Sequence, residues 1–163
     1  SKSGDPNCGV KAESLLRELF EQSAAAPGDS RMEPNEVTYS GVINAWLRSN
    51  DDPFGNAERL IAEMWKNYED GHTSLAPDTV VYTSLISAWA RSSVPEAGQR
   101  AEEVLRNMWL LQETHPDLKL KPNALSYKGA IRAWEESGHP NGEVNAERLR
   151  REMKELGVQV LEP

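Results

Sequence analysis

The stretch Pro34-Asn35-Glu36-Val37-Thr38-Tyr39 has two counterparts further along the chain, which start at Pro77 and at Pro122. Each counterpart keeps the proline, an Asn or Asp after it, and the tyrosine. The copies are 43 and 45 residues apart. A second marker, the dipeptide Ala-Glu, keeps nearly the same spacing and starts at Ala12, Ala57, Ala101 and Ala146. Because two independent markers share one period, the sequence predicts a repeated structural unit.

Each unit is predicted to contain two amphipathic helices. The first begins after the Pro-[Asn/Asp] pair, whose polar side chain can accept hydrogen bonds from free backbone N–H groups. Its apolar residues recur at i, i+4 and i+7, which is one face of an α-helix; they are Tyr39, Ile43 and Trp46, then Tyr82, Ile86 and Trp89, then Tyr127, Ile131 and Trp134. We expect these side chains, tryptophans included, to lie in the core.

The second helix carries an alanine, a leucine and a methionine on one face. These are Ala57, Leu60 and Met64, then Ala101, Leu105 and Met108, then Ala146, Leu149 and Met153. Breaks rich in proline, glycine and serine separate the two helices of a unit, and longer polar loops lead to the next unit. Residues 1–35 match only the second half of a unit, so we predict a partial repeat there, followed by repeats at 36–78, 79–123 and 124–163.

One hairpin of about 40 residues cannot bury enough apolar surface to offset the entropy lost on ordering it. Stacked hairpins share a continuous core. The expected fold is therefore all-α: a right-handed α-solenoid of stacked antiparallel helical hairpins, with seven helices in a single array. Such a stack has a long groove that suits an extended ligand, either a peptide or a single strand of nucleic acid.

Several classes of function find no support in the sequence. It contains no apolar stretch long enough to cross a bilayer and no signal peptide. The single cysteine cannot form an internal disulfide, and the three histidines lack metal-ligand spacing. No phosphate-binding loop or catalytic constellation is present. We therefore expect no membrane, metal, cofactor or small-molecule substrate and no enzymatic activity, and we attribute acidic residues such as Glu58 and Glu63 to a solvated helix face.

The motifs resemble those of the pentatricopeptide-repeat family. The segment from Val37 to Trp46 is similar to the family's first helix, and the segment from Ala57 to Met64 is similar to its second. The closing Pro-[Asn/Asp] is the family's most distinctive mark, and the resemblance covers nearly the whole chain. Tetratricopeptide repeats match less well, because their Trp-Leu-Gly and Tyr signatures are absent at the required offsets. The present units are longer than usual for the family.

The resemblance implies modular binding of single-stranded RNA, one repeat per base, within a larger protein that acts in organellar RNA processing, stability or translation. A mitochondrial or plastid location follows from the same resemblance. It assigns base reading to Ser40 with Asp78 and to Thr83 with Asn123, and by the family's pairing rule these pairs suggest guanine and adenine. Asn35 and Lys128 hold matching positions in incomplete sites. The resemblance also implies base sandwiching by Val37, Val80 and Leu125, and phosphate contacts by Lys2, Arg48 and Arg91.

Two alternatives stay open. The residues Asn35, Asp78 and Asn123 would cap helices even in a protein that binds no RNA. The groove could also belong to a protein–protein scaffold that binds a peptide or a subunit of a complex. The net charge of −8 argues mildly against nucleic acid, although the first helices are almost neutral and the acidic excess falls mainly on the second helices and the N-terminal segment.

Overall fold

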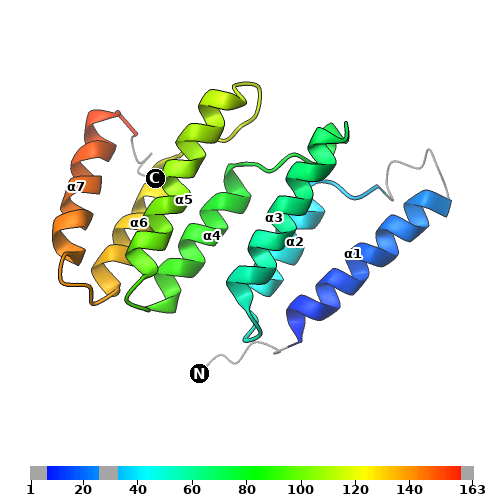
Figure 1. Ribbon diagram of the computed structural model, residues 1–163, viewed down its shortest axis with the longest axis horizontal. Helices are drawn as coiled ribbons and strands as arrows, with labels where there is room; N and C mark the ends of the chain where they lie inside the picture. Colours follow the sequence, from blue (N-terminus) through cyan, green and yellow to red (C-terminus); the bar gives the residue numbers. More distant parts are fainter. Residues whose placement is uncertain (1–6, 26–32, 159–163) are drawn as a thin grey trace, which may run out of the picture. The chain divides into compact units, whose positions relative to one another are not determined.

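The computed structural model in Figure 1 describes residues 7–25 and 33–158. Over these residues the chain forms seven α-helices, one short 3₁₀-helix and no strand, which confirms the prediction of an all-α fold. The helices are α1 (Cys8–Ala25), α2 (Glu36–Trp46), α3 (Pro53–Glu69), η2 (Thr73–Leu75), α4 (Thr79–Ser92), α5 (Ala97–Thr114), α6 (Ala124–Glu136) and α7 (Gly142–Glu155). The chain divides into two compact units, Ser1–Pro77 and Asp78–Pro163.

The first helices of the repeats, α2, α4 and α6, all begin directly after the Pro-[Asn/Asp] pair. Oδ1 of Asn35 accepts a hydrogen bond from the N–H of Thr38 at 3.0 Å, and Oδ1 of Asp78 accepts one from Val81 at 3.1 Å. Oδ1 of Asn123 accepts from the N–H of Ser126 at 3.1 Å. These bonds satisfy backbone donors that the helix itself leaves open, so the predicted capping role is confirmed.

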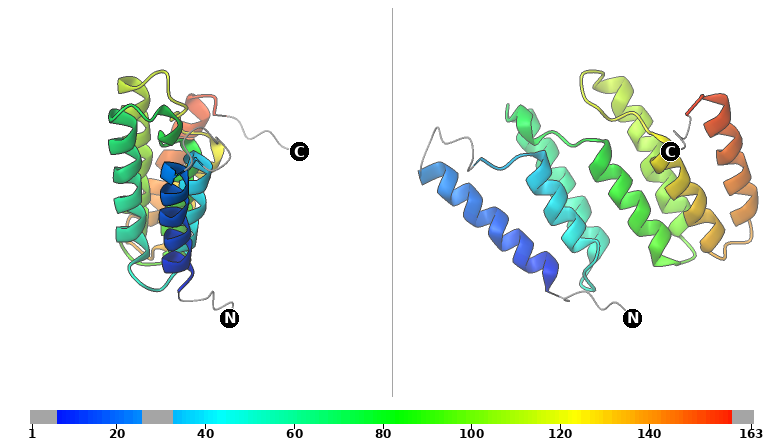
Figure 2. Two further views of the ribbon diagram at one scale, coloured as in Figure 1. Left: turned by 90° about the vertical axis from the view of Figure 1, so that its right-hand side faces the viewer. Right: turned by 180° about the vertical axis from the view of Figure 1, so that it is seen from behind.

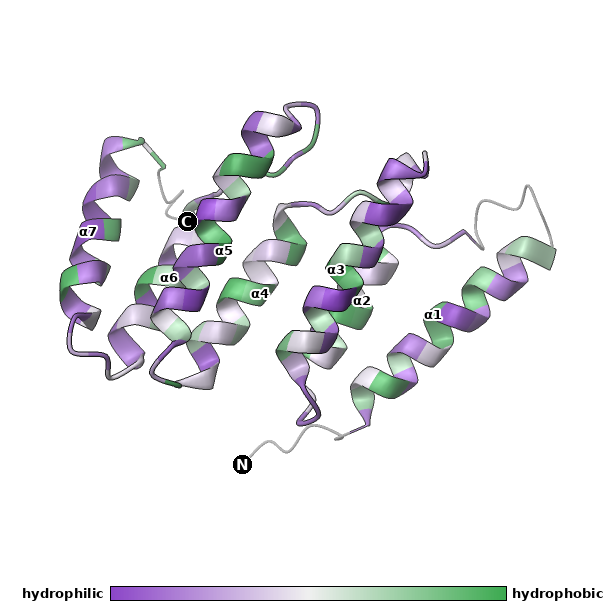
Figure 3. Cartoon of the chain, viewed as in Figure 1, coloured by the Kyte–Doolittle hydropathy of each residue, from purple (hydrophilic) through white to green (hydrophobic). Residues whose placement is uncertain are grey.

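Within each unit, successive helices pack as neighbours. In unit 1, α2 packs against both α1 and α3; in unit 2, α4 packs against α5 and α6, and α6 packs against α5 and α7. Figures 1 and 2 show the hairpins α4–α5 and α6–α7 side by side. Each helix carries hydrophobic and hydrophilic residues around its circumference, as Figure 3 shows. The buried residues of these amphipathic helices form the core.

The predicted core is confirmed for most of its members. The tyrosine and isoleucine of every first helix are buried, as are the alanine and leucine predicted for the core in α3, α5 and α7. Trp46 and Trp134 are 6% and 7% exposed. Two residues differ from the expectation, because Trp89 and Met153 are only half-buried.

The loops between repeats are less polar than the sequence analysis expected. Each contains one buried leucine, Leu75 in η2 and Leu120 before α6. In unit 2, the N–H and hydroxyl of Thr79 donate hydrogen bonds to the carbonyl oxygen of Lys119 at 2.9 and 2.6 Å. The loop that leads into α6 is therefore attached to the first turn of α4.

Two glycines of second helices lie directly against tryptophans of the following first helix. A Cβ atom added to Gly9 would lie 2.4 Å from Cδ2 of Trp46, and one added to Gly98 would lie 2.4 Å from Cδ2 of Trp134. Real side chains do not approach so closely, so each indole requires a residue without a side chain at this position. The contact fixes how near the two helices come.

We expect Gly9→Ala to destabilise the chain by about 1–3 kcal/mol, because the new methyl group must displace the rigid indole of Trp46. The matched control is Gly41→Ala in α2, where an added Cβ would meet no atom within 4 Å. There alanine should be neutral or stabilising by up to about 1 kcal/mol, through helix propensity alone. Urea unfolding followed by circular dichroism measures both, and equal effects would contradict the close contact.

Candidate nucleic-acid interface

The first turn of each first helix exposes one large apolar side chain. Val37 is 69% exposed, Val80 is 57% exposed and Leu125 is 65% exposed. Each stands two residues before the buried tyrosine of its helix. Two residues along an α-helix correspond to a rotation of about 200°, so a tyrosine that points into the core turns its neighbour outward. The structure thus places all three predicted base-sandwiching residues at the surface.

The predicted base-reading residues that follow the tyrosines lie in both units. In unit 2, Thr83 and Lys128 line the same groove. The hydroxyl of Thr83 lies 2.9 Å from the hydroxyl of Ser126 and links α4 to α6, while Lys128 is exposed. In unit 1, the half-exposed Ser40 donates a hydrogen bond to the carbonyl oxygen of Glu36 at 2.8 Å. A hydroxyl with one such bond can still accept another.

The groove in unit 2 runs between α4 and α6 and has a volume of about 330 Å³. Its lining consists of Thr83, Ser87, Ala90, Arg91, Leu125, Lys128, Gly129 and Arg132. Three of these side chains are cationic and none is acidic. Leu125, two hydroxyl groups and three positive charges therefore lie together in this groove.

Gly129 sets how closely the two walls of this groove approach. A Cβ atom added there would lie 2.7 Å from Cγ2 of Ile86 in α4. A side chain at this position would push α6 away from α4 and widen the groove. The close approach keeps Thr83 and Lys128 on a common surface.

The structure describes two of the three residues predicted to contact phosphates, and both are exposed. Arg48, just beyond α2, is exposed, and Arg91, in the last turn of α4, is exposed in the groove. Lys2 lies outside the described residues. Arg132 was not predicted as a site residue, although it lines the groove and pairs with Glu136 at 2.8 Å. Its spacing offered a signal, because Leu125, Lys128 and Arg132 recur at i, i+3 and i+7 along one helix face.

The positions of the three capping residues are compatible with capping alone and with capping together with RNA contact. Asp78 uses Oδ1 for its cap, which leaves the second carboxylate oxygen for another donor. Asn123 also uses Oδ1 alone, and both Asn35 and Asn123 are exposed. A cap therefore occupies one atom of each side chain without consuming its capacity to contact a ligand.

The acidic residues of the second helices are not a simple solvated face, which corrects the expectation for Glu63. Glu63 is half-buried and accepts a hydrogen bond from the hydroxyl of Tyr39 at 2.5 Å. Its other partner is Arg17 of α1, whose Nη2 lies 2.8 Å from Oε2. Glu58, the other residue named, is exposed as expected.

Glu63 belongs to a network of two glutamates and two arginines on successive second helices, which we call the charged ladder. In unit 1 it consists of Glu13 and Arg17 on α1 with Arg59 and Glu63 on α3; in unit 2 it consists of Glu102 and Arg106 on α5 with Arg148 and Glu152 on α7. The intervening first helix joins in both units. Trp46 Nε1 donates to Glu13 at 2.8 Å, and Trp134 Nε1 donates to Glu102 at 2.9 Å.

The ladder keeps its carboxylates ionised. The hydrogen bond from Arg17 lowers the pKa of Glu63 in spite of burial, with help from Tyr39, and Arg106 and Tyr127 act in the same way on the pKa of Glu152. Burial, together with the bond to Glu152, raises the pKa of Tyr127 to about 12. The four glutamates of the ladder are thus paired with four arginines, so the ladder itself carries no net charge.

Metal ligands and membrane-spanning helices were sought in residues 7–25 and 33–158. No group of three or more histidine, cysteine, aspartate or glutamate side chains is placed to hold a metal ion. In the same part of the chain, every helix is too short or too polar to cross a bilayer.

We expect acid to weaken the fold through the ladder. The pKa values of Glu63 and Glu152 lie below the ordinary 4.5 in the folded chain, so their stabilisation is present above pH 4.5 and is lost as the pH falls through the lowered values. Between about pH 5 and pH 3, the double variant Glu63→Gln, Glu152→Gln should lose less unfolding free energy than the parent. The exposed pair Glu58→Gln, Glu155→Gln is the control, and the same pH slope in both double variants would contradict the assignment.

Comparison with known proteins adds no family assignment to this geometry. No protein-family model matches the sequence, and no curated protein matches it significantly. The assignment of a repeat family therefore rests on the motifs and their spacing.

Proposed function

We propose that the chain binds single-stranded RNA along its first helices, as a segment of a pentatricopeptide-repeat protein. The observation that carries the proposal is the recurrence of an exposed apolar residue at the same place in three successive repeats, namely Val37, Val80 and Leu125. These side chains leave apolar area in contact with water, so they add little to the stability of the fold. Val37, Val80 and Leu125 could instead make flat apolar contacts with unstacked bases.

The proposal includes a right-handed α-solenoid built from the two units. The packing that such a solenoid would repeat is that of the hairpin α4–α5 against the hairpin α6–α7 within unit 2. Repetition of this step with a constant rotation generates a superhelix whose first helices form one continuous wall. Ser40, Thr83 and Lys128 would then follow one another along that wall, one residue per base.

The proposed role of each residue follows from the chemistry of its side chain. Val80 and Leu125 contact base faces. Thr83, with Asn123, hydrogen-bonds a base edge, for which the resemblance suggests adenine, while Ser40 with Asp78 would read guanine. Arg91, Lys128 and Arg132 neutralise phosphates, which supplies affinity without sequence preference. In the larger protein, this binding would serve organellar RNA processing, stability or translation.

One observation favours a second candidate. The chain as a whole carries a net charge of −8, which repels nucleic acid at long range. A protein–protein scaffold would use the groove for a peptide or a subunit of a complex, which does not have to be a polyanion. The two candidates differ in whether the nature of the base affects binding.

Lys128→Gln should weaken binding of a single-stranded RNA oligonucleotide several-fold and reduce the slope of log K against log salt by about 0.7, the value for one lost phosphate contact on a single strand. The matched control is Lys154→Gln, because Lys154 is also exposed but lies on α7, a second helix. Fluorescence anisotropy over a salt series measures both. Equal losses in the two variants would show that binding is not localised on the first helices.

Asp78→Asn should change base preference while the fold is preserved, since asparagine caps a helix as well as aspartate does. Binding of oligonucleotides that differ at a single position, A, C, G or U, reveals the change. We expect the base preference that the resemblance assigns to Ser40 with Asp78 to move away from guanine. An unchanged ranking of the four bases, with the thermal midpoint also unchanged, would favour the scaffold instead.

A further inference from the structure

Two hydroxyl groups on neighbouring helices of unit 2 form a hydrogen bond at the edge of the groove. Oγ1 of Thr83 in α4 lies 2.9 Å from Oγ of Ser126 in α6, and either hydroxyl could donate its hydrogen. Ser126 is fully buried, whereas Thr83 lines the groove. Thr83 has no other hydrogen-bond partner among the residues that the structure describes. The direction of this one bond therefore decides what the hydroxyl of Thr83 offers to a ligand.

The other contacts of Ser126 favour one direction. Its Oγ accepts a hydrogen bond from the N–H of Asn123 at 3.3 Å, so its single hydrogen goes either to Oδ1 of Asn123, at 3.2 Å, or to Thr83, at 2.9 Å. Oδ1 of Asn123 already accepts from the N–H groups of Leu125 and Ser126 at 2.9 and 3.1 Å, which occupy its two lone pairs. Thr83 is the nearer and less crowded acceptor. Ser126 is therefore the donor in the bond to Thr83.

Because Thr83 accepts from Ser126, its own hydrogen is free to point into the groove. Ser40, the corresponding residue of α2, is in the opposite state, since its hydroxyl donates to the carbonyl oxygen of Glu36 at 2.8 Å. A bond of this kind to the preceding turn is common for serine and threonine inside a helix, and Thr83 does not make it. Thr83 thus offers a ligand a hydrogen-bond donor, and Ser40 offers only lone pairs.

We propose that Ser126 is a positioning residue that makes Thr83 a hydrogen-bond donor and thereby selects the class of base that the groove binds. This inference rests on the proposed function. The central ring nitrogen of the Watson–Crick edge is an acceptor in adenine and cytosine, whereas it carries a hydrogen in guanine and uracil. A donor at Thr83 therefore selects adenine or cytosine, and an acceptor at Ser40 selects guanine or uracil.

Thr38 provides a matched control for Ser126. Both are the third residue of a first helix, and Thr38 likewise accepts a hydrogen bond from the N–H of Asn35, at 3.3 Å, and donates one to its Oδ1, at 3.1 Å. Its partners in the described part of the chain all belong to Asn35. Thr38→Ala therefore removes the same bonds at the helix start and leaves the hydroxyl of Ser40 as it is.

The first test needs no RNA. In Ser126→Ala the hydroxyl of Thr83 loses its donor and should turn to the carbonyl oxygen of Thr79, four residues earlier, as Ser40 does with Glu36. Three-bond NMR couplings of Thr83 report this change of side-chain rotamer. The variant should fold, because α4 begins with Val81 at the same place and has no hydroxyl there. Couplings that stay unchanged would overturn the inference.

The second test measures RNA binding by fluorescence anisotropy, with oligonucleotides that carry A, C, G or U at one position. Thr83→Val first locates the position that faces Thr83, as the one whose base preference it alters. There the parent and Thr38→Ala should both favour A and C over G and U by about tenfold, the value of one hydrogen bond. In Ser126→Ala the preference should fall to about twofold or reverse, since Thr83 then resembles Ser40.

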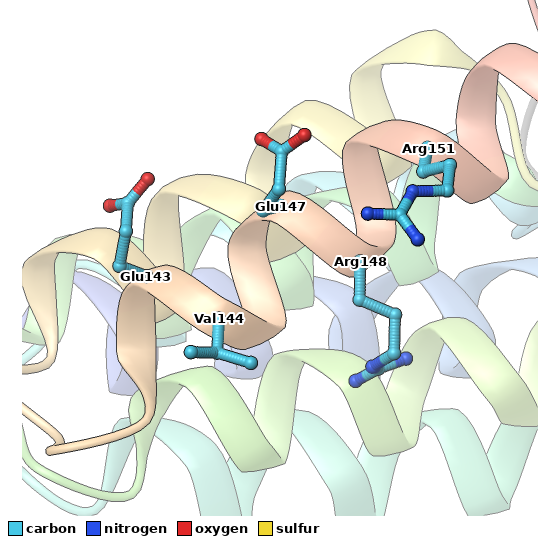
Figure 4. Close-up of a pocket in the computed structure, with 5 residues that line it drawn as sticks. All are labelled: Glu143, Val144, Glu147, Arg148 and Arg151. Atoms are coloured by element: carbon cyan, nitrogen blue, oxygen red, sulfur yellow. The ribbon is translucent and has the colours of Figure 1, made fainter.

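A hollow on α7 provides a control for binding outside the groove. It measures about 500 Å³ and is lined by Glu143, Val144, Glu147, Arg148 and Arg151, none of which carries a hydroxyl group. Figure 4 shows Glu143 and Glu147 on one side of α7, away from the guanidinium of Arg148. Two carboxylates repel a phosphate backbone, so Arg151→Gln should leave the base preference unchanged.

The outcomes separate this inference from the proposed function. If the parent binds none of the oligonucleotides, the proposed function fails and this inference fails with it. If the parent binds with a base preference that Ser126→Ala leaves intact, or that Thr38→Ala reduces to the same extent, this inference alone is overturned. The inference is also wrong if Thr83→Val alters the preference at no position.

Discussion

The rotation of the first helices α2 and α6 about their own axes is fixed by hydrogen bonds from their aromatic side chains to the charged ladder. The hydroxyl of Tyr39 donates to Glu63, and the indole of Trp46 donates to Glu13. Tyr127 and Trp134 repeat the arrangement with Glu152 and Glu102. One helix is thus tied to the second helices on both of its sides, and it cannot turn about its axis without breaking buried polar contacts.

The hydrogen bonds from these aromatic donors contribute more to the stability of the fold than the ion pairs of the ladder do. Exposed ion pairs contribute about 0–1 kcal/mol, and the four arginines are partly exposed. A half-buried hydroxyl or indole N–H left without an acceptor costs about 1–3 kcal/mol. The ladder therefore acts chiefly as a set of fixed acceptors. Because Tyr39 is held inward, Val37 is turned outward, so the candidate interface is a consequence of the same constraint.

The sequence predicted the features that depend on local spacing. Helix starts follow from a cap residue and its own next few amides, and the core follows from a helical period, so Asn123 and Ile131 could be placed without any tertiary information. The ladder could not be found by the same reading, because Glu13 and Arg59 lie on different helices 46 residues apart. That separation is close to one repeat, and it recurs for Glu102 and Arg148. The burial of Leu120 and the partial exposure of Trp89 depend on packing that no local pattern encodes.

The close packing of α4 and α6 has a consequence for any RNA strand bound as we propose. Packed helices lie about 8–10 Å apart, and the contact of Gly129 with Ile86 leaves no room for a side chain between α4 and α6. Stacked nucleotides rise by only about 3.4 Å per strand position. A strand that meets one repeat per base must therefore give up its stacking and stretch. On the proposed surface, intramolecular base pairing of the RNA competes with binding, and a strand once bound is kept open along the segment that the repeats cover.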